Sequence, residues 1–322
     1  MPLPEIPMEP TFTPTFPDIP LSEKPTLADA LTTIGQGSFR AVDFRGLSDL
    51  SRADAAELAR IWPEFAEEAR VRAVMLMDEL AEETVELNFS RALRIALDDP
   101  SPAVRQLAVD ALWEDDSTEL CDRVLAILAS DDSQDVRAAA AKGLARFADV
   151  ACAGELDDAL TDRIWRALST TAADPAEPFL VRRRALESLA VFGSRPEVVE
   201  LIRDAYDADD PGHHAGALYA MGRTLDPRWL DILLHELDSE DAEMRYEASR
   251  AAGAIGDVRA IPGLASAAID EDNEVRQEAI LSLGRIGGPA SVRVLRGLAE
   301  TASPADQQAI ADALGESVDE QL

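Results

Sequence analysis

The chain has 322 residues, 47% of them hydrophobic, and its 62 acidic residues outnumber 30 basic ones to give a formal charge of −32. This charge repels polyanions at long range, so neither nucleic acid nor an anionic membrane surface is expected as a partner. Aromatic residues make up only 5% while alanine and leucine abound, which favours a core of packed helices over a core of β-sheets.

Targeting signals and cysteines indicate the compartment. No basic segment followed by an apolar run begins the chain, and no apolar stretch reaches the length of a membrane span. Two cysteines, Cys121 and Cys152, are too few for a disulfide framework and suit a reducing environment. We therefore expect a cytoplasmic protein without a membrane partner.

The first segment differs in composition from the rest. Residues 1–25 hold eight of the nineteen prolines and little periodicity, which predicts a disordered, proline-rich tail. A linear motif that docks on another protein is the alternative interpretation of this tail. Residues 26–50 are expected to form a short helix, starting at "TLADALTTI", and a linker.

An internal repeat dominates the remaining chain. An alanine followed four positions later by a second apolar residue returns at intervals of 32, 45, 32, 31 and 31 residues. These alanines are Ala108, Ala140, Ala185, Ala217, Ala248 and Ala279. Three positions before them stand Arg105, Arg137, Arg182, His214, Arg245 and Arg276. Arginine at five of six such places is far above random scatter, so the repeat is a selected feature.

Each repeat is predicted to contain two helices. In "DNEVRQEAILSLGRIGG", the apolar residues Val275, Ala279 and Leu283 recur at helical spacing on one face. Asp272 or Asn273 can cap the start of this first helix, and Gly287 can end it. A short turn then leads to a second helix, as in "DPRWLDILLHEL" or "SVRVLRGLAE". Each unit, such as 240–270, is therefore expected to be a helical hairpin that begins with the arginine-bearing helix.

Stacked hairpins predict an all-α fold, an α-solenoid. One hairpin cannot bury both of its apolar faces, so neighbours must share a continuous core. We expect about seven hairpins over residues 51–316, with 51–97 as an N-terminal capping unit and 302–316 as a C-terminal half-unit. Residues 317–322 should be an acidic, frayed end. The 45-residue interval indicates an insertion near "ADVACAGELDD".

The sequence "VRQEAILSLGRIGG", followed by "PASVRVLRGL" and preceded by "MRYEASRAAGAIGDVRAIPGL", resembles the HEAT-repeat family, in the short form also found in phycobilisome lyases. The resemblance covers roughly residues 70 to 315. It implies a right-handed superhelix with first helices on the convex side and second helices lining a concave groove. It also implies protein binding as the commonest use.

The repeated arginines are expected to be structural. HEAT repeats resemble one another in ladders of aspartate and arginine, and a guanidinium can bridge two acceptors. We expect Arg276 to reach loop acids such as Asp270, Asp272 or Asp241, and His214 to be a gap in the line. The predicted ladder consists of Arg105, Arg137, Arg182, Arg245 and Arg276.

Catalytic interpretations lack the residues they need. Deoxyhypusine hydroxylase resembles this chain in repeat layout and binds two irons through His-Glu pairs early in first helices. The matching places here are Gln277-Glu278, Tyr246-Glu247, Ala215-Gly216 and Arg183-Arg184, without a histidine. His213-His214 is expected at an exposed helix start, and no phosphate loop or nucleophile elbow is present. Neither a metal nor a cofactor is expected.

The favoured function is a non-catalytic, monomeric scaffold that binds a partner protein along its concave face. The alternative is a bilin lyase-like enzyme or chaperone that acts on a chromophore-bearing protein, since arginines and aromatic rings on second helices could hold a tetrapyrrole. The predicted contact residues on second helices are Arg123, Arg166, Arg203, Trp229 and Glu236.

Overall fold

The computed structural model describes residues 25–208 and 210–319. All regular structure in these residues is helical, and the chain divides into two compact units, residues 1–95 and 96–322. The proline-rich segment, apart from its last residue, and the final three residues of the acidic end lie outside the described ranges.

The N-terminal unit, residues 1–95, is a small helical assembly. Local polar contacts start its helices: Thr26 and Ser51 form capping boxes with Asp29 and Asp54. Its helices are α1 (Leu27–Gln36), α2 (Ala41–Phe44), α3 (Arg52–Ile61), α4 (Glu67–Glu83) and α5 (Ser90–Ala96), with short 3₁₀ turns η1 (Arg45–Leu47) and η2 (Trp62–Glu64). Buried side chains at its centre include Ile34, Phe44, Leu47, Leu58, Trp62 and Met77.

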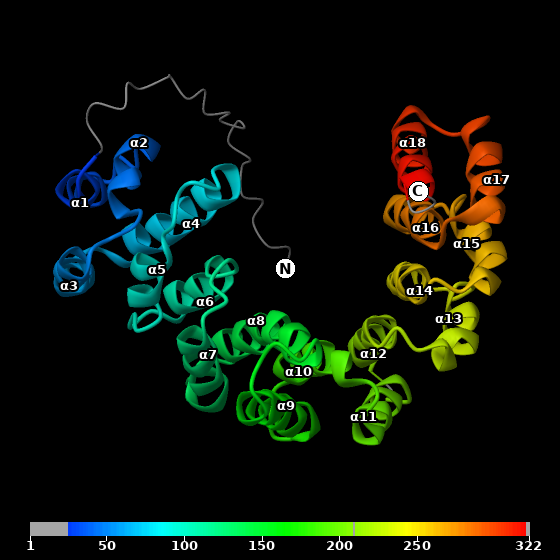
Figure 1. Ribbon diagram of the computed structural model, residues 1–322, viewed down its shortest axis with the longest axis horizontal. Helices are drawn as coiled ribbons and strands as arrows, with labels where there is room; N and C mark the ends of the chain where they lie inside the picture. The colour runs from blue at the N-terminus through cyan, green and yellow to red at the C-terminus, as the bar shows by residue number, and fades with distance from the viewer. Residues whose placement is uncertain (1–24, 209, 320–322) are drawn as a thin grey trace, which may run out of the picture. The chain divides into compact units, whose positions relative to one another are not determined.

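The C-terminal unit, residues 96–322, contains two layers of helices (Figure 1). The helices of the first layer are α6 (Pro102–Ala111), α8 (Gln134–Cys152), α10 (Phe179–Leu189), α12 (Pro211–Arg223), α14 (Ala242–Ile255), α16 (Asn273–Ile286) and α18 (Pro304–Asp319). The second layer consists of α7 (Thr118–Ser130), α9 (Asp158–Ala173), α11 (Pro196–Tyr206), α13 (Leu230–Glu236), α15 (Ile261–Ala267) and α17 (Gly288–Ala299). The 3₁₀ turns η3 (Ala190–Phe192), η4 (Pro227–Trp229) and η5 (Val258–Ala260) lie in the connections.

The first layer is the inner one. Its successive helices pack directly against one another from α6 to α18, whereas successive helices of the other layer barely touch. Figure 1 shows the arginine-bearing helices on the inside of the curve of this unit. The expectation that helices such as α13 come second in their hairpins and line the concave side is therefore wrong, because they lie on the convex side. We call the two sets the inner layer and the outer layer.

Small residues explain why the inner helices approach so closely. Glycines 31 residues apart face the next inner helix, and a methyl group built on each would lie 2.7 to 3.0 Å from a backbone Cα of that helix. The three pairs in contact are Gly222 with Ala251, Gly253 with Ser282, and Gly284 with Ala313. These contacts let successive inner helices pack closely, whereas successive outer helices barely touch.

Packing also sets the boundaries of the repeats. Each outer helix packs most extensively on the inner helix that follows it, as in α7 with α8 and α9 with α10. A hairpin therefore starts with an outer helix, one helix before units such as 240–270 begin. A period in the sequence fixes the spacing of hairpins but leaves their starting point open. The all-α solenoid itself is confirmed, and Val275, Ala279 and Leu283 are fully buried in its core.

Candidate partner-binding surface

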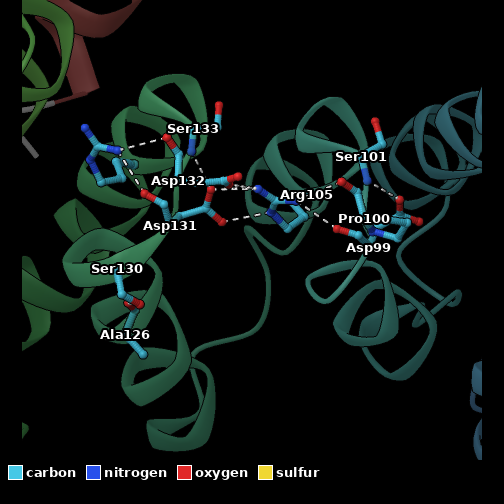
Figure 2. A network of polar contacts seen from close by, with 10 residues as sticks. Asp99, Pro100, Ser101, Arg105, Ala126, Ser130, Asp131, Asp132 and Ser133 are labelled. Carbon is cyan, nitrogen blue, oxygen red and sulfur yellow. Dashed lines mark hydrogen bonds and ion pairs between the residues drawn. The ribbon is translucent and has the colours of Figure 1, made fainter.

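Arg105 shows how the repeated arginines connect neighbouring hairpins (Figure 2). Its Nε and Nη2 donate to the two carboxylate oxygens of Asp131 at 2.8 and 2.7 Å, and Nη2 also reaches Asp132 at 2.7 Å. Its Nη1 donates to the carbonyl oxygen of Asp99 at 2.9 Å, in the loop before its own helix. The hydrogen bond to Asp131 raises the pKa of the Arg105 guanidinium. One side chain thus fixes two loops.

The same geometry returns in the last repeats. Arg245 donates to the Asp270 carboxylate at 2.7 and 2.9 Å and to the carbonyl oxygen of Ser239 at 2.9 Å. Arg276 in turn donates to the carbonyl oxygen of Asp270 at 2.9 Å and approaches Asp306 at 3.5 Å. The bond from Arg245 holds the pKa of the Asp270 carboxyl below its ordinary value. Arg276 therefore uses the backbone of Asp270, not its side chain.

Two further arginines make different contacts in the middle of the stack. Arg137 donates to Glu177 at 3.0 Å and to the carbonyl oxygen of Asp131 at 2.8 Å. Arg182 donates to the carbonyl oxygen of Ala172 at 3.3 Å. The bonding is thus least regular around the 45-residue interval, where α8 extends to Cys152 before the chain turns at Gly154.

His214 makes a contact of its own in place of the arginine bonds. Its Nε2 lies 3.6 Å from Glu236, which also accepts a hydrogen bond of 2.6 Å from the Tyr206 hydroxyl. Burial and this bond raise the pKa of that hydroxyl well above its ordinary value. Ser239 stands 25 residues after His214, at the spacing that separates Arg245 from Asp270. Histidine, shorter than arginine, pairs with Glu236 on the neighbouring outer helix.

The contact residues predicted from sequence all lie on the outer layer or its connections. Arg123 pairs with Asp98, and Arg166, whose side chain is 71% exposed, lies 3.6 Å from Asp162. The guanidinium of Arg203 lies 5.7 Å from the ring centre of Trp229. Trp229 is only 1% exposed and Glu236 is buried. The prediction is wrong for these last two, because packing hides them from a partner.

A cleft that sequence reasoning missed lies on the inner layer. It occupies about 380 Å³ at the carboxyl ends of α8, α12, α14 and α16. Its polar lining consists of Asp149, Tyr219, Arg223, Arg250 and Arg285. Its apolar lining consists of Val191, Gly222, Leu225, Ala251 and Ala254. Arg250 and Arg285 lie outside the arginine repeat, so a search based on that repeat passes over them.

Three arginines line this cleft, and each guanidinium has one carboxylate beside it. Arg223 Nη2 donates to Asp149 at 2.6 Å. Arg285 Nη1 donates to Glu278 at 2.8 Å. The Arg250 guanidinium stacks 4.5 Å from the ring centre of Tyr219 and approaches Glu247 at 3.8 Å. All three arginine side chains remain partly exposed.

Glu247, which approaches the cleft residue Arg250, is a buried titratable group. Burial raises the pKa of its carboxyl to about 7, against the lowering effect of the Arg250 and Arg183 guanidiniums. Carboxylates on Glu187 and Glu243 also raise this pKa. Near neutral pH the Glu247 side chain is therefore partly uncharged, and the positive charge of Arg250 is only partly balanced.

Among residues 25–208 and 210–319, no group of three or more histidine, cysteine, aspartate or glutamate side chains is arranged to hold a metal ion. No helix in the part of the chain that the structure describes is long and apolar enough to cross a membrane.

Comparison with known proteins agrees with the helical geometry. The family model for HEAT repeats matches residues 90–174 and 230–315, which together exceed half of the chain. The chain belongs to the HEAT-repeat family. The first match begins at α5, the helix before α6, and the second begins at the outer helix α13. Both starting points agree with hairpins that begin one helix before the arginine-bearing helix. No curated protein sequence matches this HEAT-repeat chain.

Several solved structures are similar to the HEAT-repeat fold seen here. A structure of Kap95p bound to RanGDP has a TM-score of 0.52 at 13% identity, covering 90% of this chain and 45% of that chain. YibA from Escherichia coli has a TM-score of 0.48 at 16% identity, covering 85% and 95%. The CpcE–CpcF complex of phycocyanin lyase from Nostoc sp. PCC7120 has a TM-score of 0.47 at 18% identity, covering 90% and 100%.

Proposed function

We propose that this HEAT-repeat chain is a non-catalytic scaffold that binds a partner protein through the inner layer of its C-terminal unit. The observation that carries the proposal is the cleft, which is lined by three partly exposed arginines, by Tyr219 and by apolar residues. Arginine and tyrosine are the side chains most enriched at the centres of protein interfaces. Kap95p, whose fold is similar, binds a protein, RanGDP, which supports this use of the fold.

The bilin alternative finds less support in the contacts. A tetrapyrrole needs exposed arginines beside exposed aromatic rings, because its propionates and its ring system must both be covered. On the outer layer Arg123 and Arg166 lie beside aspartates, and Trp229 is buried under Arg203. We expect no change in the absorption spectrum when the purified protein is incubated with a bilin. A shift that saturates would favour the alternative.

Affinity capture tests the scaffold directly. The tagged full-length chain is incubated with lysate of the source cells, and bound material is quantified by mass spectrometry and absorption spectroscopy. We expect one protein at a stoichiometric ratio to the chain. Recovery of a stoichiometric small molecule or metal without any protein would contradict the proposal.

A further inference from the structure

We propose that the inner-layer cleft binds one carboxylate of a partner segment together with an adjacent aliphatic side chain. This inference rests on the proposed scaffold function and names the chemistry of the partner. An acidic side chain or a chain terminus can supply the carboxylate. The guanidiniums of Arg223, Arg250 and Arg285 supply the donors, and Leu225 with Ala254 supplies the apolar contact.

Donor geometry is the first argument. A guanidinium carries five N–H donors in a planar fork, and one carboxylate uses at most two or three of them. Arg223 donates through Nη2 to Asp149, and Arg285 donates through Nη1 to Glu278. Arg250 lies beside the Tyr219 ring, which holds the guanidinium in place without using its in-plane donors. These contacts use only part of the donors of each guanidinium, and the other donors can bind a ligand.

Charge balance indicates a single negative charge on the ligand. Three guanidiniums face Asp149, Glu247 and Glu278, so the local charge is near zero or slightly positive. The chain as a whole carries −32. The acidic chain would repel a polyanion or a doubly charged phosphate, and the small positive charge of the cleft would offset little of that repulsion. A carboxylate carries a single negative charge, which the small positive charge of the cleft can balance.

Leu225 is the second, independent observation. Its backbone has a φ of 54°, in the left-handed region that disfavours side chains, and its side chain is 62% exposed. The positions 31 and 62 residues later hold Gly256 and Gly287, with φ of 74° and 64°. This repeat therefore keeps an exposed leucine where its neighbours have the glycine that the backbone favours. An exposed, strained leucine at the rim of the cleft suits a role in contact with a ligand.

Selection from a displayed library of random twelve-residue peptides tests the cleft. We expect the full-length chain to enrich peptides with aspartate, glutamate or a free carboxyl end next to leucine, isoleucine or valine. Replacing the acid of a selected peptide by its amide should weaken binding about tenfold or more. No enrichment, or enrichment of basic peptides, would overturn the proposal, as would stronger binding of a phosphoserine version than of the glutamate version.

Variants locate the binding site. The double variant Arg250→Gln and Arg285→Gln should lose the selected peptides, while Arg293→Gln and Arg296→Gln, which remove the same charge from exposed positions on α17, should keep them. Leu225→Gly should weaken peptide binding and raise the melting temperature together, which separates a contact role from a structural one. Unchanged peptide binding in both cleft variants would overturn the proposal. If the captured partner still bound these variants at full strength, the scaffold would stand without this cleft.

Discussion

Glycine at three positions spaced by 31 residues sets the distance between the last inner helices. A methyl group at Gly253 would lie 2.2 Å from Ser282 Oγ and 2.8 Å from Ser282 Cα. Backbone cannot rotate away as a flexible side chain can, so α14 and α16 would have to separate. These glycines therefore set how closely α12, α14 and α16 pack on the next inner helix.

The variant Gly253→Ala tests this role. We expect it to lower the free energy of unfolding by about 1–3 kcal/mol, because the added methyl group overpacks the contact between two helices. Gly297→Ala is the matched control, since a methyl group there meets nothing within 4 Å in helix α17. That change should raise stability by about 0.5–1 kcal/mol, through the lower flexibility of the unfolded chain. Urea unfolding measures both, and equal effects would contradict the close packing.

Glu247 predicts a pH dependence of stability. Burial raises the pKa of its carboxyl to about 7 in the folded chain, from an ordinary value of 4.5. The folded state thus binds the proton more tightly, so this contribution to stability is complete below about pH 4.5 and is lost as pH rises through 7. Glu247→Gln, which stays neutral, should gain melting temperature relative to the parent chain between pH 5 and pH 8. A difference that does not change with pH would show that Glu247 is not buried as described.

At the scale of elements, the arginine-bearing inner helices are tied to the loops on both sides. The side chains of Arg245 and Asp270 are mostly shielded from water, and two hydrogen bonds of 2.7 and 2.9 Å join them. Two parallel hydrogen bonds of this kind stabilise the fold more than an isolated surface ion pair does, because the second bond costs little additional side-chain entropy. These bonds fix how each hairpin sits on the next.

Arg245→Gln should therefore destabilise the solenoid by about 1–3 kcal/mol. The pKa of Asp270 is held low by Arg245, so this contribution is present at neutral pH and is lost as pH falls through the folded pKa, below the ordinary 3.8. The stability deficit of the variant should accordingly shrink in acid. Arg259→Gln removes an exposed arginine that pairs with the nearby Asp257 and should change stability less. Thermal unfolding at pH 7 and pH 3 measures the two variants, and an equal loss for both would contradict the structural role.

The helices and their buried faces were largely predictable from the sequence. Val275 and Leu283 share a helical face and repeat every 31 residues, and burial of that face follows directly. Which layer lies inside does not follow, because curvature depends on contacts between successive hairpins, such as that of Gly253 with Ser282. A periodic pattern also has no marked beginning, so the pairing of helices emerged only from packing.

The cleft was less accessible to sequence reasoning than the fold. Its residues come from four helices and two connections between positions 149 and 285, and only the stacking of the inner layer brings them together. Leu225 carried a usable signal, since glycine stands at the corresponding places of the next two repeats. Trp229 and Glu236 were predicted as contact residues from their residue types, but both side chains are buried. A residue type that suits an interface also occurs in a packed core, so residue type alone does not predict exposure.

At the scale of the whole molecule, a strongly acidic chain places three arginines together on the inner layer of its C-terminal unit. The net negative charge of the chain repels polyanions, whereas the three arginines can bind a single monoanion. Arg166 on the outer layer lies 3.6 Å from Asp162 and is not part of this cluster. We therefore propose that the partner binds to the inner layer.

Site-specific photo-crosslinking tests that assignment most directly. A p-benzoylphenylalanine residue is introduced either at Ala254, an exposed residue that lines the cleft, or at Arg166 on outer helix α9. After capture of the partner from lysate, illumination should join the partner to the Ala254 variant and leave the Arg166 variant uncrosslinked. Crosslinking from Arg166 without crosslinking from Ala254 would contradict the account and return partner binding to the outer layer.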